Sequence, residues 1–461
     1  MRDHGRRTPG RRLTDVWRTG SVGSIVVCAV LISSVGPAAS VDNVVAPGST
    51  PPTSPAAAVL APTPIANSTA PAPTPTGIQK AVSPILKAST LGQFSAVVID
   101  PATETVLLDV RAGRQRTPAS TIKLLTASAA LSVLDPGERL ATTVLLKDTT
   151  LTLVGGGDAT LARKEQPGVE AANLSALADQ VEQNVTANAV ELQYDDSLFT
   201  GPKLAPGWPS SFPIDGVVAP VTALMVDQGR VRPGAASRVD NPSRQAAQVL
   251  AGLLKKRGLT VRMTGEGKAP EGATEVGRVE SPTIRDLVER MLTDSENDLA
   301  EALGHLVGGR VNGKFTFASG AKVVEETAAK LGLAVDGLSV VDGSGLSGRD
   351  KVPPITLAGL LVSVARQTDP ALWPIGSGLP VAGFTGTLDD RFTRGLTADA
   401  AGYVRAKTGT LSGVVGLAGT VKDVDGRVLV FAVLANDVPS LDAARDALDQ
   451  FASRLAKCGC S

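Results

Sequence analysis

The spacing of apolar residues predicts strands at both ends of the globular part of the chain. Phe94 to Asp100 and Thr103 to Val110 are rich in β-branched and other apolar residues, and a short turn separates them. Val415 to Lys422 and Arg427 to Asn436 repeat this arrangement near the C-terminus. Paired runs of this kind are typical of β-hairpins. We therefore expect one sheet assembled from the two ends of the chain, with a large insertion between them.

Helical spacing occurs in two segments that belong beside this sheet. After Lys123, apolar residues recur every three or four positions until Asp135-Pro136-Gly137 ends the pattern, at Leu124, Leu125, Ala129, Leu131 and Leu134. A second helix is expected from about Leu441 to Leu455. Ser120 would open the first helix, with Lys123 one turn along the same face.

The first 77 residues have a different composition. Arginines precede the apolar run Val22 to Val35, and small residues follow it as far as Ser40. This order predicts that residues 1–40 are a secretory signal peptide. A membrane anchor is the alternative, because the run approaches the roughly 18 residues that span a bilayer. Residues 41–77, rich in Pro, Ala and Thr, predict an extended tether. With either a signal peptide or a membrane anchor, most of the chain would be exported.

Composition and charge narrow the classes of function. Of 461 residues, 43% are hydrophobic and 20% charged, as in an ordinary globular protein. Lys plus Arg and Asp plus Glu both number 45. This balance argues against nucleic acid and favours a neutral or small zwitterionic partner. Cys458 and Cys460 are too close in sequence to hold a fold together, although an oxidising compartment could join them. With His305 they supply too few ligands for zinc, so no metal or cofactor is expected.

The segment Thr117 to Leu125, TPASTIKLL, places a serine one turn before a lysine. One reading is a helix cap with an exposed lysine; the other is a nucleophile beside its base. A serine hydroxyl needs a neighbouring base to become a nucleophile, and a lysine whose pKa is lowered by burial can serve. The histidine that follows residue 77, His305, fits an ordinary position on a helix, LAEALGHL. A lysine is therefore the expected base.

Two further motifs accompany the serine and lysine. Ser-x-x-Lys is weak alone, and a second copy begins at Ser319. Ser295-Glu296-Asn297 lies between two helical patterns, and Lys407-Thr408-Gly409 comes just before the C-terminal hairpin. Ser-x-x-Lys, Ser-x-Asn and Lys-Thr-Gly in this order are the motifs of penicillin-binding proteins and serine β-lactamases. The Ser120 copy precedes the other two motifs, whereas the Ser319 copy does not precede Ser295.

The chain thus resembles the class C low-molecular-mass penicillin-binding proteins of the DacB type, which are D-alanyl-D-alanine carboxypeptidases and endopeptidases. The likeness extends from about Ile78 to Cys460 and includes the blocks LVGGGDATL, DDSLFTGPKLAPGW, VVDGSGLSGRD and GFTGTLDDRF. It implies an α/β fold, a β-lactamase/transpeptidase-like domain of antiparallel sheet flanked by helices. The expected domain comprises residues 78–145 and 275–461, with an inserted domain at 146–274. A β-lactamase lacks such an insertion, so the insertion favours a penicillin-binding protein over a β-lactamase.

The resemblance assigns roles to the matched motifs. Ser120 would be the nucleophile and Lys123 its base. Ser295 would pass a proton, and Asn297 would hold Lys123 or the substrate amide. Lys407 would add positive charge near the nucleophile and the substrate carboxylate.

Substrate-binding roles follow in the same way. Thr408 and Thr410 would bind the substrate carboxylate, and the backbone N–H groups of Ser120 and Thr410 would form the oxyanion hole. Gly409 would leave room for a peptide along the strand edge. For Asp158, after three glycines, there are two readings: a turn residue that bonds its own backbone, or a partner for the ammonium of a diaminopimelate side chain.

Two other matched residues carry structural expectations. Trp208 is expected to be a packing anchor rather than a binding platform, and Asp342 to Gly345 a tight turn rather than a direct catalytic element. The resemblance as a whole implies an exported serine DD-peptidase that acts on D-Ala-D-Ala ends or D-amino-acid cross-links of peptidoglycan stem peptides, with β-lactams as covalent inhibitors. Membrane contact would come through the N-terminal segment. A wall-binding scaffold with slow turnover is the alternative from another class.

Overall fold

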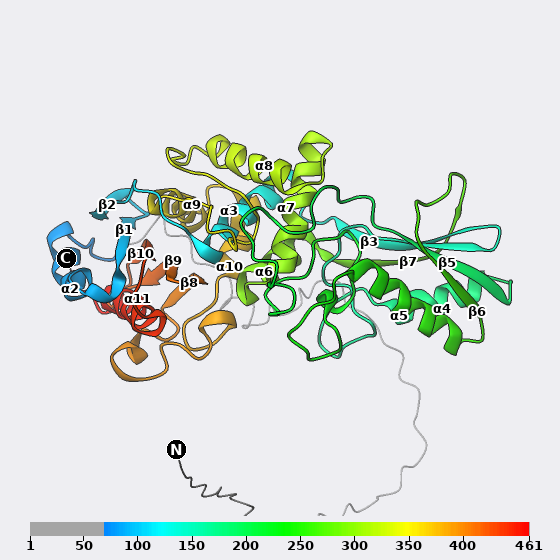
Figure 1. The fold of residues 1–461 in the computed structure, drawn as a ribbon. Helices are drawn as coiled ribbons and strands as arrows, with labels where there is room; N and C mark the ends of the chain where they lie inside the picture. Colours follow the sequence, from blue (N-terminus) through cyan, green and yellow to red (C-terminus); the bar gives the residue numbers. More distant parts are fainter. Residues whose placement is uncertain (1–68, 461) are drawn as a thin grey trace, which may run out of the picture. The chain divides into compact units, whose positions relative to one another are not determined.

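The computed structural model describes residues 69–460, and the expected signal or anchor at residues 1–40 lies outside this range. Five antiparallel strands form the first sheet, in the order β2-β1-β10-β9-β8. Their bounds are Thr105–Val110, Gln93–Asp100, Val428–Asn436, Val414–Lys422 and Val404–Leu411. The sheet therefore joins the two ends of the globular chain, and both predicted hairpins are confirmed (Figure 1).

Helices cover both faces of this sheet, as the alternation along β10 shows. Phe431 and Val433 pack into the same core as α2 (Pro75–Leu86) and α11 (Leu441–Ala456). Val430 and Ala432 pack into the opposite core, which also contains α3 (Lys123–Val133) and α9 (Pro354–Arg366). Successive side chains of a strand point to opposite faces, so an uninterrupted apolar run fits a sheet buried on both sides.

The remaining helices surround α3, in which Lys123 to Leu131 are all buried. The sequence pattern predicted one apolar face, but every side of this stretch is enclosed because helices and the sheet pack around it. The helices that complete this layer are α6 (Ile284–Asp294), α7 (Asn297–Asn312), α8 (Phe317–Lys330) and α10 (Trp373–Gly378). A helix buried on all sides gives its side chains fixed positions, which a catalytic group requires.

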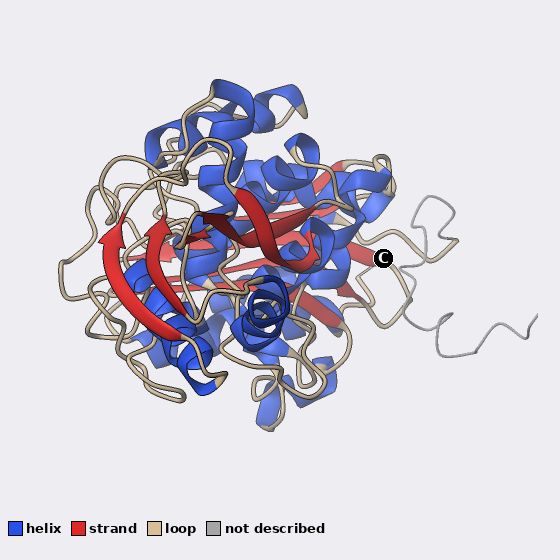
Figure 2. Cartoon of the chain, turned by 90° about the vertical axis from the view of Figure 1, so that its right-hand side faces the viewer, coloured by secondary structure: helices blue, strands red, loops and turns tan. Residues whose placement is uncertain are grey.

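A second sheet is formed by the chain between α3 and α6, in the order β6-β5-β4-β3-β7. Its strands lie on the right of Figure 1, the side that faces the viewer in Figure 2. The bounds are Thr260–Glu266, Ala189–Asp195, Thr150–Val154, Arg139–Lys147 and Thr274–Thr283. Helices α4 (Leu174–Asn184) and α5 (Pro242–Lys256) share its apolar core. β4, β5 and β6 run parallel, and β3 pairs antiparallel with β4 and β7. The inserted-domain boundaries at 146 and 274 stay predictions.

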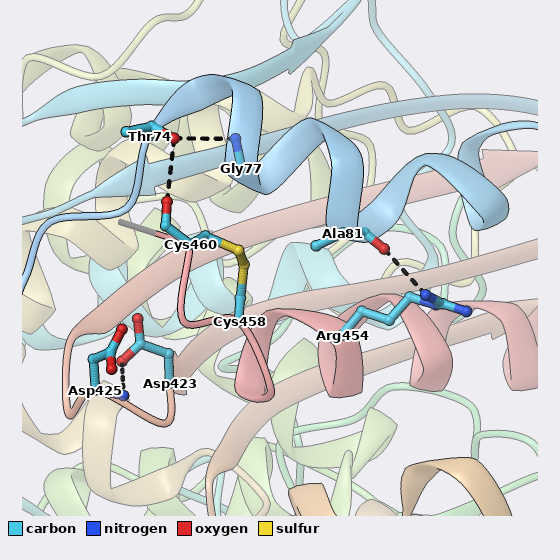
Figure 3. The surroundings of a disulfide bond; sticks show 8 residues. All are labelled: Thr74, Gly77, Ala81, Asp423, Asp425, Arg454, Cys458 and Cys460. Carbon is cyan, nitrogen blue, oxygen red and sulfur yellow. Dashed lines mark hydrogen bonds between the residues drawn. A yellow bond between two sulfur atoms is a disulfide. The ribbon is translucent and has the colours of Figure 1, made fainter.

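The N-terminal edge of the described chain is tied to its C-terminus. Thr74 caps α2, and its N–H and Oγ1 both bond Cys460 O, while a disulfide joins Cys458 to Cys460 (Figure 3). Arg454 on α11 donates to Ala81 O on α2. Structured chain therefore begins before the expected end of the tether at residue 77. No helix within residues 69–460 is long and apolar enough to cross a membrane.

Candidate active site

Ser120 lies in a tight turn that leads into α3. Residues Ala119–Ile122 form a 3-10 turn, and the α-helix begins at Lys123 rather than at Ser120. Ala119 has φ of +48°, a conformation that costs a residue with a side chain about 1 kcal/mol. This backbone is held from two sides, because a Cβ at Gly345 would lie 2.0 Å from Ala119 O, and one at Gly409 would lie 2.7 Å from Pro118 O.

The contact at Gly409 gives that residue a different role from the expected one. The missing side chain lets β8 pack against the turn that carries Ser120, with Ala119 Cβ and Thr121 Cγ2 both 3.2 Å from the position of a Cβ. A glycine is therefore required here by the protein's own backbone, and the expected role of Gly409 in admitting a peptide along the strand edge stays a prediction.

Lys123 is completely buried, and its amine contacts three oxygens. Nζ lies 2.8 Å from Ser120 Oγ, 2.8 Å from Asn297 Oδ1 and 2.9 Å from Ser344 O. The amide and backbone oxygens can only accept hydrogen bonds. When the amine is neutral, its two N–H bonds satisfy these two acceptors. Its lone pair then faces Ser120 Oγ, in the position from which it can take the hydroxyl proton.

Burial also makes the neutral amine accessible near neutral pH. Desolvation lowers the pKa of Lys123 from 10.5 to about 8, against the opposing effect of the carboxylates of Glu301, Asp342 and Asp298. A charged amine loses its hydration in such a place, so the neutral form is favoured. Lys123 therefore combines burial with a lowered pKa, as a lysine base needs.

Ser295 and Asn297 come from the junction of α6 and α7. Ser295 ends α6 in the left-handed conformation, with φ of +58°, so the chain turns sharply and brings Asn297 to the first position of α7. Asn297 Nδ2 donates to Val217 O at 2.8 Å, which turns Oδ1 toward Lys123. The orientation of the amide is thus fixed by hydrogen bonds at both ends.

Lys407 is also completely buried, on β8. Its Nζ donates to Thr408 O at 3.1 Å. Burial lowers its pKa well below the ordinary value, and the nearby charges of Lys123 and Arg391 lower it further. Two buried ammonium groups beside one another would repel, so the pair favours deprotonation. Thr408 Oγ1 lies 2.8 Å from Thr387 Oγ1, which joins the strand to the 386–391 loop.

The outer edge of β8 is open beside Ser120. Near its start, Ala382 N donates to Val404 O and Ala406 N donates to Pro380 O, so the backbone groups of even-numbered residues point away from β9. Backbone groups alternate in direction along a strand. The N–H groups of Thr408 and Thr410 therefore point toward the open edge, where a substrate backbone can pair with them.

A cavity of about 520 Å³ joins these elements. Its lining comprises Ser120, Ser295, Thr387, Asp390, Arg391, Thr408, Thr410, Asp442, Arg445, Asp446 and Asp449. All three motifs contribute to it or lie directly behind it. The charged side of the cavity was not predicted: charges spaced three or four residues apart at the start of α11 look like an ordinary solvated helix face, and no motif marks them.

Asp158 is not brought to this cavity. Its side chain is only 2% exposed, and Oδ1 accepts hydrogen bonds from Thr160 N at 2.7 Å and Thr160 Oγ1 at 2.6 Å. Burial raises its pKa from 3.8 to about 6. This is the turn arrangement, in which the carboxylate bonds its own backbone. An enclosed carboxyl group has no open path to a substrate ammonium, so the expected diaminopimelate contact is not carried into our proposal.

The other sequence candidates occupy structural positions. Ser319 Oγ donates to Gly308 O inside the α7–α8 packing. His305 is buried on α7, with its ring between Phe199 and Phe317, and burial lowers its pKa to about 4. Trp208 is buried against Phe317, and its Nε1 donates to Asp342 Oδ2 at 2.6 Å. The tight turn at 342–345 was expected, but the contact of Ser344 O with Lys123 was not predicted.

Comparison with solved structures shows which fold the chain has. The fold is similar to that of penicillin binding protein 4 (dacB) from Haemophilus influenzae, with a TM-score of 0.70 and 21% identity over 82% of this chain and 99% of that chain. The same protein complexed with a β-lactam gives a TM-score of 0.65. The α/β transpeptidase-like fold is thereby confirmed, and with the family match below the chain is a serine-type peptidase of the penicillin-binding class.

Sequence comparison then identifies the family. Residues 78–238 and 232–455 match the D-Ala-D-Ala carboxypeptidase 3 (S13) family, and the chain belongs to it. Carboxypeptidase DacB of Mycolicibacterium smegmatis is 34% identical over 405 residues, which cover 85% of this chain and 86% of that protein. The D-alanyl-D-alanine carboxypeptidase of an Actinomadura species is 28% identical over 450 residues, covering 78% and 80% respectively.

Proposed function

We propose that this carboxypeptidase acts through an acyl-enzyme on Ser120, with Lys123 as the base. The observation that carries the proposal is the geometry of Lys123 Nζ, 2.8 Å from Ser120 Oγ with both N–H bonds of the neutral amine directed at Asn297 Oδ1 and Ser344 O. A base must be within hydrogen-bond reach of the proton and have a suitable pKa. Lys123 meets both conditions.

The reaction then proceeds in two halves. Ser120 Oγ attacks the carbonyl carbon of the penultimate D-alanine while Lys123 Nζ takes the hydroxyl proton. Backbone N–H groups of Ser120 and Thr410 stabilise the oxyanion. The tetrahedral species collapses as the C–N bond breaks, and the terminal D-alanine leaves after its amine receives the proton of Lys123 through Ser295. Water next attacks the ester carbonyl and gives a proton to the neutral Lys123. The ester C–O bond then breaks, Ser120 Oγ takes this proton from Lys123, and the shortened peptide leaves with a free carboxyl group.

The open edge of β8 suits the end of a stem peptide. Thr408 and Thr410 line the cavity with Ser120, and their backbone N–H groups face it. The two threonine hydroxyls and Lys407 would bind the terminal carboxylate. Carboxypeptidase action on D-Ala-D-Ala ends is therefore the main activity, with cross-link cleavage as a second activity of the same site. We propose that the enzyme acts outside the cytoplasm, after export directed by residues 1–40.

Covalent labelling tests this proposal. A fluorescent penicillin resembles acyl-D-Ala-D-Ala and should form a stable ester that maps to Ser120. The label should be absent from Ser120→Ala and present in Ser319→Ala, the matched control from the second Ser-x-x-Lys motif. Mass analysis of products from defined muropeptides then shows whether the terminal D-alanine or a cross-link is cleaved. Labelling on another serine would refute the assignment, and labelling without any product would favour the slow wall-binding scaffold.

A further inference from the structure

The peptide bond between Ser344 and Gly345 connects Lys123 to a buried carboxylate. The carbonyl of this peptide accepts from Lys123 Nζ at 2.9 Å, and its N–H donates to Asp342 Oδ1 at 2.6 Å. The C=O and N–H of a trans peptide point in opposite directions. Fixing the N–H on one side therefore fixes the direction of the carbonyl on the other.

Asp342 is itself held by several donors. Its second oxygen, Oδ2, accepts from Ser347 N at 2.7 Å and from Trp208 Nε1 at 2.6 Å, and the residue is only 1% exposed. Trp208 lies in the segment between β5 and α5, far from Asp342 in sequence. A short chain of hydrogen bonds thus runs from Trp208 through Asp342 and the Ser344–Gly345 peptide to Lys123 and Ser120.

Building on the function proposed above, we propose that Asp342 is a positioning residue for this reaction. Its carboxylate holds the Ser344–Gly345 peptide so that the carbonyl occupies one N–H of Lys123, and Trp208 holds the carboxylate. If the carbonyl turned away, one N–H of neutral Lys123 would be free to point at Ser120, and the lone pair would lose its fixed direction. Asp342 would then matter for proton transfer without touching the substrate.

Two other buried carboxylates of the same region differ from Asp342 in what they hold. Glu301 accepts from Gly343 N and Ser344 N, and Asp350 accepts from Val341 N and Asp342 N. Neither bonds the N–H of the Ser344–Gly345 peptide. Burial and the neighbouring Asp342 raise the pKa of Asp350 to about 9, so its carboxyl group is neutral and Asp350→Asn keeps both this charge state and a donor toward Asp342. Asp350 is therefore a matched control, because it is equally enclosed, serves the same turn and holds backbone that does not contact Lys123.

The experiment compares Asp342→Asn, Asp350→Asn and Trp208→Phe in the full chain. The amide of Asp342→Asn has two possible orientations. In one, its NH2 group faces the donors Ser347 N–H and Trp208 Nε1–H. In the other, the NH2 group faces Gly345 N–H, and the hydrogen bond to that N–H is lost. Stopped-flow acylation with a fluorescent penicillin separates the noncovalent dissociation constant from the rate constant of acylation. Melting curves report folding. Acylation of the unchanged protein, absent in Ser120→Ala, is the separate check on the proposed function.

The acylation rate constant of Asp342→Asn should fall about tenfold or more, with the dissociation constant within about twofold, since an orienting hydrogen bond is lost and the substrate contacts remain. Asp350→Asn should keep the unchanged rate constant. Trp208→Phe keeps an aromatic ring and removes one hydrogen-bond donor to Asp342. The acylation rate constant of this variant should fall about threefold. Equal rate constants for the two Asp variants would overturn the proposal. If Asp342→Asn does not fold, an unchanged rate constant in Trp208→Phe would overturn it.

Discussion

The two sheets of this protein are built on different plans. The first sheet is buried on both faces, with seven of the eight residues of β1 enclosed, and its edge strand carries Lys407 to Thr410. In the second sheet, β5 alternates between buried and half-buried positions, and α4 and α5 pack on one face. A sheet covered on both sides holds its neighbours rigidly. The candidate active site therefore lies beside the more enclosed sheet, along the edge strand β8.

The comparison extends to the polar residues that each region buries. Beside the first sheet, Lys123 has three oxygen partners, and two of them, Asn297 Oδ1 and Ser344 O, belong to groups held by a further hydrogen bond. At the end of β4, which belongs to the second sheet, Asp158 bonds Thr160 with one oxygen, while the other has no partner among the described residues. A buried network that is fully satisfied specifies one arrangement, and a partly satisfied residue does not. The Lys123 amine is thus held in one position by several groups, whereas Asp158 serves a turn.

The largest expected effect is the removal of the proposed base. Lys123→Ala should lower the acylation rate constant by two to four orders of magnitude, the scale of losing a general base. Lys322→Ala is the matched control, because Lys322 occupies the same place in the second Ser-x-x-Lys motif and its exposed side chain pairs with Glu326. Rates are measured by penicillin acylation. An active Lys123→Ala variant, or a loss in Lys322→Ala, would contradict the comparison of the two motifs.

The pH dependence of acylation should report the pKa of Lys123. Its folded pKa is lowered to about 8, so the neutral amine increases as pH rises and is fully formed above that value. The rate constant should rise up to about tenfold per pH unit below this point and then level off. A rate constant independent of pH between 6 and 9 would exclude Lys123 as the titrating base.

A smaller effect is expected from filling the space at Gly409. Gly409→Ala places a Cβ 2.7 Å from Pro118 O, so the turn that carries Ser120 must shift. We expect a loss of about 1–3 kcal/mol in stability and about tenfold in acylation, since overpacking of this kind moves backbone. In the second region, Gly252→Ala on α5 meets nothing within 4 Å and should stabilise the protein by about 0.5–1 kcal/mol with unchanged acylation. For both variants, denaturant titration measures the stability and penicillin acylation measures the rate constant.

Only part of the fold and of the candidate site could be predicted from the sequence. The two hairpins and the proximity of Lys123 to Ser120 follow from residue spacing, since both depend on contacts local in sequence. The convergence of Ser295 and Lys407 on Ser120 came from resemblance to a family. Ser344 O could not be predicted, because a backbone carbonyl carries no signal of residue type. Asp158 was misleading for a related reason: its burial depends on packing from distant segments, which spacing does not reveal.

The smallest effect on activity is expected at Asp158, where stability should change instead. Asp158→Asn should leave penicillin acylation within about twofold, because the side chain is enclosed and lies outside the cavity. The folded pKa is raised from 3.8 to about 6, so the unfolded chain loses this proton at lower pH than the folded protein does.

The titration of Asp158 should therefore lower the free energy of unfolding by about 3 kcal/mol as the pH rises from about 4 to 6. Above pH 6 this residue should cause no further change. The amide of Asp158→Asn does not titrate, keeps an acceptor for Thr160 and should lack this fall. Denaturant titrations at pH 4 and pH 7 measure the difference between the two proteins. An identical change with pH in both would show that Asp158 is charged and solvated. It would then return to consideration as a partner for a substrate ammonium, and the contrast between the two regions would weaken.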